Sequence, residues 1–81
     1  MFGMSFSSDS LVGEKIPENS KSAVEALFSR RYNVRSVSKD HWTDDYYMVK
    51  LYDGKIMTVR TATGYTLMNQ PYTYIRSVSI I

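Results

Sequence analysis

Cysteine is absent from this 81-residue chain, and histidine, proline and glycine are scarce. Without cysteine, no disulfide can staple the fold and no thiolate can bind a metal or attack a substrate. Because His41 is the single histidine, a structural zinc site would also lack its usual ligands. The spacings typical of phosphate-binding glycine loops, zinc proteases and serine hydrolases do not occur in the sequence. We therefore expect a non-enzymatic protein with no cofactor and no metal site.

Long apolar runs are missing as well, since the longest are only a few residues. We therefore expect no membrane-spanning segment and no membrane partner. The first residues, MFGMSFSSDS, have neither a basic start nor an apolar core, so they do not resemble a signal peptide. The lack of cysteine fits a reducing compartment. We expect a cytoplasmic protein.

Tyrosine and positive charge are concentrated in the C-terminal two-thirds of the chain. Residues 1–29 carry two lysines against four acidic residues, a net charge of −2. Residues 30–81 carry eight Lys or Arg against four Asp, a net charge of +4. The seven tyrosines and the single tryptophan all follow residue 31. A chain of this length forms one domain with a marginal core, because it buries only roughly 60% of its unfolded surface.

Residues 1–16 show neither a helical nor a strand period and are rich in serine and glycine. Two interpretations stay open for this N-terminal arm. It is flexible, as termini usually are, or it orders on a partner, because Phe2 and Phe6 would otherwise face water. Residues 17–81 then form the single domain.

One helix is predicted over about residues 20–32. Its apolar stripe at helical spacing consists of Val24, Leu27 and Phe28. Ser22 and Glu25 match a capping box at the start, and Asn33 suits the left-handed conformation that ends many helices.

Four strands are predicted after the helix, over residues 34–38, 46–52, 55–63 and 72–81. Gly64 interrupts the pattern of the third strand, and the sequence leaves open whether residues 65–68 continue it. Asp53-Gly54 is a strong hairpin signal. A type I turn with a bulge at Gly54 sorts the side chains best. It places Tyr47, Val49, Leu51, Met57 and Val59 on a buried face, and Met48, Lys50, Tyr52, Ile56, Thr58 and Arg60 on the opposite face. The fold class is therefore α+β, with an N-terminal helix on a four-stranded, mostly antiparallel sheet (α-β-β-β-β). We expect the core to include Leu27, Phe28, Val49, Leu51 and Val59.

Two segments are almost identical: VRSVS at residues 34–38 and IRSVS at residues 75–79. Their surroundings differ, because a helix precedes the first and a turn and strand precede the second. We therefore do not interpret them as a duplicated unit. Each segment is predicted to form a strand with one half-apolar face and one small, polar face. The sequence leaves open whether they lie at the two sides of the sheet or pair with each other.

The segment DHWTDD, residues 40–45, is the one candidate for catalysis or cation binding. A histidine beside carboxylates can act as a base, and neighbouring carboxylates can hold a hard cation. The alternative is a solvated loop with Trp42 packed on the core.

Interaction with a partner is the function that the composition favours. Tyrosine, tryptophan, methionine and arginine are enriched in interface cores, and an unpaired C-terminal strand invites strand addition. We expect a small protein-binding module whose partner is another protein or a second copy of the chain. The predicted contacts are Lys50, Tyr52, Arg60, Tyr74 and Arg76, with Phe2 and Phe6 as a second anchor.

Single-stranded nucleic acid is the alternative partner, because Lys50, Tyr52, Lys55 and Arg60 share one hairpin with Tyr46 and Tyr74 nearby. Aromatic rings stack bases and cations hold phosphates. In size, lack of cysteine and single-domain organisation, the chain resembles the short accessory proteins of phages and other mobile elements. That resemblance implies an inhibitor of a host protein or a minor particle component.

Overall fold

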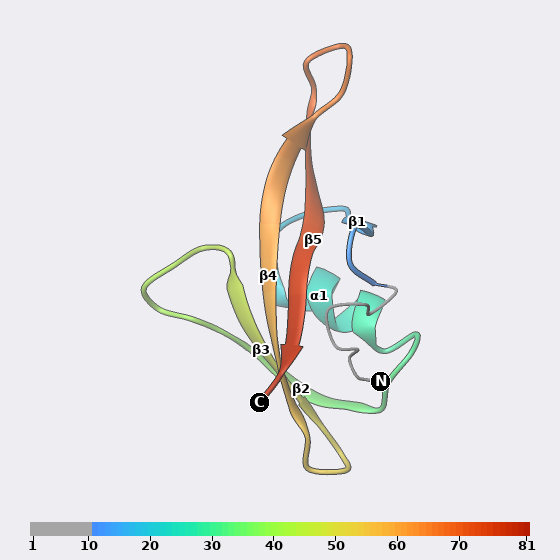
Figure 1. Ribbon diagram of the computed structural model, residues 1–81, viewed down its shortest axis with the longest axis vertical. Coiled ribbons are helices and arrows are strands. Elements are labelled where there is room, and N and C mark those ends of the chain that lie inside the picture. The colour runs from blue at the N-terminus through green and yellow to red at the C-terminus, as the bar shows by residue number, and fades with distance from the viewer. Residues whose placement is uncertain (1–10) are drawn as a thin grey trace, which may run out of the picture.

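A computed structural model describes residues 11–81 and contains one helix and one five-stranded antiparallel sheet (Figure 1). The elements are β1 (Lys15–Ile16), α1 (Lys21–Phe28), β2 (Val34–Lys39), β3 (Tyr46–Leu51), β4 (Ile56–Tyr65) and β5 (Pro71–Ile80). The strand order is β1-β5-β4-β3-β2. The α+β class and the antiparallel sheet are confirmed. The predicted strand count of four is wrong, and so is the position of the helix, which follows the first strand.

The additional strand, β1, is held by long-range contacts with β5. Lys15 pairs with Tyr74 and Ile16 pairs with Thr73. The pairing continues upstream, because the Gly13 amide donates to the Ile75 carbonyl at 2.8 Å. A two-residue strand has no detectable period, so sequence patterns could not indicate it. Phe2 and Phe6 lie outside the described residues.

Helix α1 (Lys21–Phe28) begins close to the start of the predicted range and ends about four residues earlier than predicted. Its N-cap is Ser20, whose side-chain oxygen accepts a hydrogen bond from the Ala23 amide at 3.2 Å. The predicted cap at Ser22 is therefore wrong: Ser22 lies inside the first turn. The helix ends at Phe28. Asn33 is not left-handed, since Asn69 is the one non-glycine residue with a positive φ in the described part of the chain. The apolar stripe is confirmed, with Ala23, Val24, Leu27 and Phe28 all buried.

The β3–β4 hairpin has the predicted bulged turn. The Gly54 amide donates to the Leu51 carbonyl at 3.1 Å, and the Leu51 amide donates to the Lys55 carbonyl at 2.9 Å. Gly54 has φ +94°, which residues with a side chain rarely adopt. This geometry confirms the predicted sorting of side chains. The buried residues of the hairpin are Tyr47, Val49, Leu51, Met57 and Val59.

The β4–β5 hairpin uses the same turn geometry and projects beyond the rest of the sheet (Figure 1). Here Asn69, with φ 63°, takes the left-handed position and its amide donates to the Thr66 carbonyl at 2.8 Å. Gly64 does not interrupt β4, contrary to our expectation. It lies opposite Tyr72, whose ring atoms come within 2.6 Å of the place where a Cβ would stand. A side chain at residue 64 would therefore displace the Tyr72 ring.

A polar cluster around Asn19 joins the segment before α1 to the centre of the sheet. Its side-chain oxygen accepts hydrogen bonds from the Tyr47 hydroxyl at 2.8 Å and from the Thr61 hydroxyl at 3.1 Å. Its amide group donates to the Asp44 carbonyl. These bonds satisfy two buried hydroxyls, which would otherwise destabilise the core. Burial raises the pKa of the Tyr47 phenol, and the nearby Asp44 carboxylate raises it further.

The two RSVS segments lie in β2 and β5, at opposite sides of the β3–β4 pair. Each contains a register shift that leaves its arginine as the additional residue of a β-bulge. In β2, Val34 pairs with Leu51 and Ser36 pairs with Lys50, so Arg35 has no partner. In β5, the shift in pairing from Ser77 to Ile75 similarly leaves Arg76 without one.

Candidate binding surface

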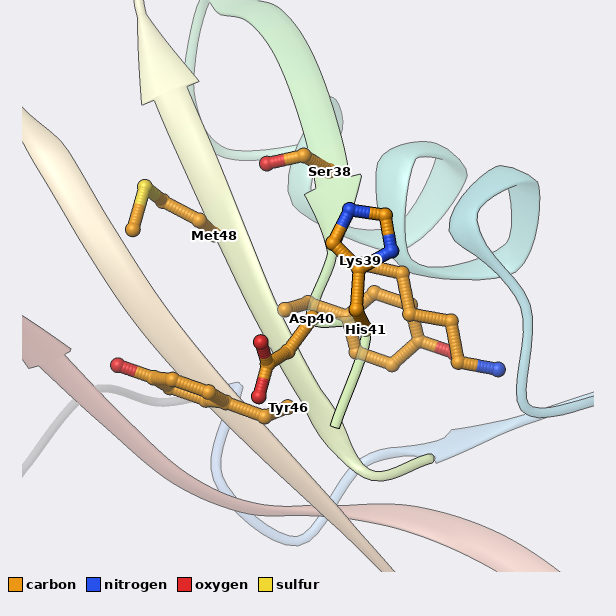
Figure 2. Close-up of a pocket in the computed structure, with 7 residues that line it drawn as sticks. Ser38, Lys39, Asp40, His41, Tyr46 and Met48 are labelled. Carbon is orange, nitrogen blue, oxygen red and sulfur yellow. The ribbon is translucent and has the colours of Figure 1, made fainter. Parts of the chain in front are cut away.

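The face of the sheet opposite α1 is not covered by any element of residues 11–81. The alternation of buried and exposed positions along the strands assigns side chains to it. We call this surface the open face. Its members are Lys15, Ser36, Ser38, Tyr46, Met48, Lys50, Ile56, Thr58, Arg60, Ala62, Tyr72, Tyr74, Ser77 and Ser79. Figure 2 shows Ser38 and Met48 of neighbouring strands pointing to the same side.

Charge is segregated between the open face and the rest of residues 11–81. Lys15, Lys50 and Arg60 occupy outward strand positions, and the bulge residues Arg35 and Arg76 are exposed beside them. No Asp or Glu occupies an outward position of these strands. The acidic residues lie in the helix, loops and turns: Glu14, Glu18, Glu25, Asp40, Asp44, Asp45 and Asp53. Asp40 follows β2 and its carboxylate lies beside Tyr46 at the edge of the open face, where the five cations outnumber it. The open face therefore carries a net positive charge and attracts anions, although the net charge of the whole chain is only +2.

Three tyrosines, Tyr46, Tyr72 and Tyr74, lie on the open face around and beyond Arg60. The Arg60 guanidinium carbon lies 4.8 Å from the centre of the Tyr46 ring. The Lys15 ammonium lies 4.4 Å from the centre of the Tyr72 ring. The Tyr72 and Tyr74 rings are tilted, with their centres 5.9 Å apart. Cations and aromatic rings are thus interleaved within one patch, where cation–π contacts hold them.

The residues predicted from sequence to contact a partner are not all in one place. Lys50, Arg60 and Tyr74 lie on the open face, and Arg76 lies at its edge in the β5 bulge. Tyr52 is exposed at the β3–β4 turn, away from the tyrosine patch.

Sequence reasoning missed Lys15 and Tyr72 as members of the patch. The alternation of Tyr72 with Tyr74 along one strand was a signal that could have revealed Tyr72. No local pattern indicates Lys15, because the β1–β5 pairing brings it there.

Asp40 and His41 of the DHWTDD segment line a pocket of about 280 Å³ at the edge of the open face (Figure 2). In Figure 2 the Asp40 carboxylate lies beside the Tyr46 ring, whereas the His41 imidazole points the other way. Asp40 accepts a hydrogen bond from the Thr43 hydroxyl at 3.4 Å. Trp42 is 90% exposed, so the expectation that it packs on the core is wrong. Among residues 11–81, no three His, Asp or Glu side chains gather as a metal site would require.

Comparison with protein-family models, curated proteins and solved structures finds no match for this chain. In the described part of the chain, no helix has the length and apolar character needed to span a membrane.

Proposed function

We propose that the protein is a non-enzymatic binding module whose open face binds single-stranded nucleic acid. The observation that carries the proposal is the segregation of charge: cations and tyrosines share the open face, and carboxylates do not occupy its outward strand positions. Single strands are bound by cations that hold phosphates and by rings that stack bases, each stack contributing ~1–3 kcal/mol.

This arrangement reverses the order of partners that composition alone favours. Tyrosine and arginine are common in protein interfaces, but a protein ligand has no general need for a face on which cations outnumber carboxylates. A single strand presents a regular row of negative charges and flat bases. The open face offers both matching features within one patch, so charge complementarity favours the nucleic acid.

Titration of a fluorescent oligothymidine, about twelve nucleotides long, at several salt concentrations tests the proposal. We expect binding at low salt that weakens steeply as salt rises, because each phosphate contact releases counterions. The double variant Lys50→Met/Arg60→Met should bind at least about tenfold more weakly and lower the salt slope by about 1.4, or about 0.7 for each lost contact.

Lys21→Met/Arg30→Met is the matched control, because it removes the same charge from α1 and the segment after it. We expect this control to bind within about twofold of the parent chain, since its cations lie away from the open face. Thermal melts of both variants establish that they fold. Negligible binding at low salt, or an equal loss in the two double variants, would contradict the proposal.

A protein partner is the second candidate, favoured by the tip of the β4–β5 hairpin. Leu67 is fully exposed there and Met68 is 82% exposed. Exposed apolar side chains on a projecting turn fit the apolar pocket of a partner protein. An inhibitory accessory protein would use such a contact. Leu67→Ser/Met68→Ser should then abolish capture of a defined protein from the source cell while leaving oligothymidine binding unchanged. If the variant still captures the protein, the tip of the hairpin is not the contact.

A further inference from the structure

The open face is built from two strand pairs with the same pattern of residues. In the β2–β3 pair, Ser36 lies opposite Lys50 and Val37 opposite Val49. In the β5–β4 pair, Ser77 lies opposite Arg60 and Val78 opposite Val59. The bulge arginines, Arg35 and Arg76, precede the two serines. Each pair therefore presents a bulge arginine, a serine and an outward cation in the same order.

A pseudo-two-fold axis relates the two pairs. Strands β3 and β4 are antiparallel, and Met48 lies opposite Thr58 at their centre. Rotation about an axis through that centre, perpendicular to the sheet, exchanges Lys50 with Arg60. The two cations are one strand apart and four residues out of register, so their Cα atoms are separated by about 14 Å. Because the Arg60 guanidinium lies over the Tyr46 ring, four residues from Lys50 along β3, the two cations occupy separate places on the open face.

We name the two arrangements after their outward cations. The Lys50 half consists of Arg35, Ser36 and Lys50, and the Arg60 half consists of Arg76, Ser77 and Arg60. Each half offers a hydroxyl and two cations, which are groups that commonly contact phosphate.

The aromatic residues break this symmetry. Tyr46 lies opposite Arg60, but the equivalent position opposite Lys50 is Ile56. Tyr74 and Tyr72 pair with Ala62 and Gly64, beyond Arg60 along the β4–β5 ribbon. Strand β2 begins at Val34, so the Lys50 half has no equivalent extension. Within the strands, rings that can stack bases therefore lie beside the outward cation at the Arg60 half only, whereas the ring nearest to Lys50 along the chain, Tyr52, belongs to the β3–β4 turn.

We propose that the two halves hold different parts of one strand: the strand positions of the Lys50 half bind backbone phosphate, and those of the Arg60 half bind phosphate and stack bases. This inference rests on the proposed function. It predicts that loss of either cation has the same effect on a base-free strand, whereas loss of a ring affects only a strand that carries bases.

Two probes of equal charge separate these effects: the oligothymidine described above and an abasic strand of the same length. On the abasic probe, Lys50→Met and Arg60→Met should weaken binding equally and each lower the salt slope by about 0.7. Tyr46→Ile, which copies the equivalent residue Ile56, should weaken oligothymidine binding at least about fivefold and leave abasic binding unchanged. Tyr46→Phe keeps a ring and should bind both probes as the parent does.

The reciprocal variant, Ile56→Tyr, adds a ring to the Lys50 half and should strengthen binding of oligothymidine alone. A parent chain that binds neither the oligothymidine nor the abasic strand would overturn the proposed function itself. Binding of both probes, with Tyr46→Ile weakening them equally or with unequal effects of the two cations on the abasic strand, would overturn only the division of the site.

Discussion

Residues 34–38 and 75–79 differ at one position and form the same bulged strand, yet they are buried to different depths. Ile75 and Val78 are 0% and 3% exposed, whereas Val34 and Val37 are only half-buried. The difference comes from their neighbours. Strand β5 has β4 on one side and β1 with residues 13–14 on the other, while β2 is the last strand of the sheet. The five-residue pattern thus determines the local form and the face, and the tertiary surroundings determine the depth.

The largest difference between the two segments should appear when one residue is inserted between the first serine of each segment and the valine that follows it. The bulge at Arg76 keeps Ile75 and Val78 on the same buried face, so an additional residue between Ser77 and Val78 moves Val78 to the open face and Ser79 toward the core. We expect a loss of at least about 3 kcal/mol in the free energy of unfolding, or failure to fold. The same insertion between Ser36 and Val37 moves only the half-buried Val37 of the last strand, so we expect about 1 kcal/mol. Urea denaturation measures both, and equal losses would contradict the comparison.

Truncation of the first apolar residue should give the next largest contrast. Ile75→Ala removes a fully buried side chain next to Thr61 and should destabilise the fold by ~2–5 kcal/mol. Val34→Ala removes a half-buried side chain at the edge, and we expect about 1 kcal/mol or less. Thermal melts of the two variants, measured side by side, test this difference. A Val34→Ala variant as unstable as Ile75→Ala would show that the last strand of the sheet is packed as well as β5.

The second apolar residue allows a stricter comparison, because both segments have valine there. Val78→Ala should cost about 2 kcal/mol, since two buried methyl groups are lost and a cavity remains. Val37→Ala should cost about half as much, because Val37 is partly exposed already. Chemical denaturation resolves a difference of this size. Identical midpoints for the two variants would mean that the two valines are packed equally well.

The smallest effect should follow from the bulge arginines as charges. A bulge with an exposed cation hinders edge-to-edge pairing of sheets. Arg35→Ser and Arg76→Ser should each change the stability by no more than about 0.5 kcal/mol. The double variant should self-associate at concentrations at which the parent is monomeric, as light scattering would detect. A double variant as monomeric as the parent would show that the two arginines do not protect the edges.

Sequence patterns predicted the features that depend on local periods and local turn chemistry. The apolar stripe of α1, the bulged turn at Gly54 and the two faces of the β3–β4 hairpin belong to this group. The choice of Ser20 over Ser22 as N-cap was not predicted, because both serines precede the same stripe. Strand β1 was missed since long-range pairing creates it.

The candidate site was predictable to the same extent. Lys50 and Arg60 were expected to share one face of the hairpin, and the register places both on the open face. The patch around Tyr72 and Lys15 depends on how β1 meets β5, which no local pattern contains. The pseudo-two-fold relation was not predictable from local patterns either. In the Lys50 half the serine precedes the outward cation along the chain, whereas in the Arg60 half it follows the cation.

Because Tyr72 lies so close to Gly64, residues 64 and 72 should change together among related sequences. A side chain at residue 64 would take the space of the Tyr72 ring and move it away from Lys15. Lineages that retain the tyrosine should therefore retain the glycine, and lineages that replace the glycine should carry a smaller residue at position 72.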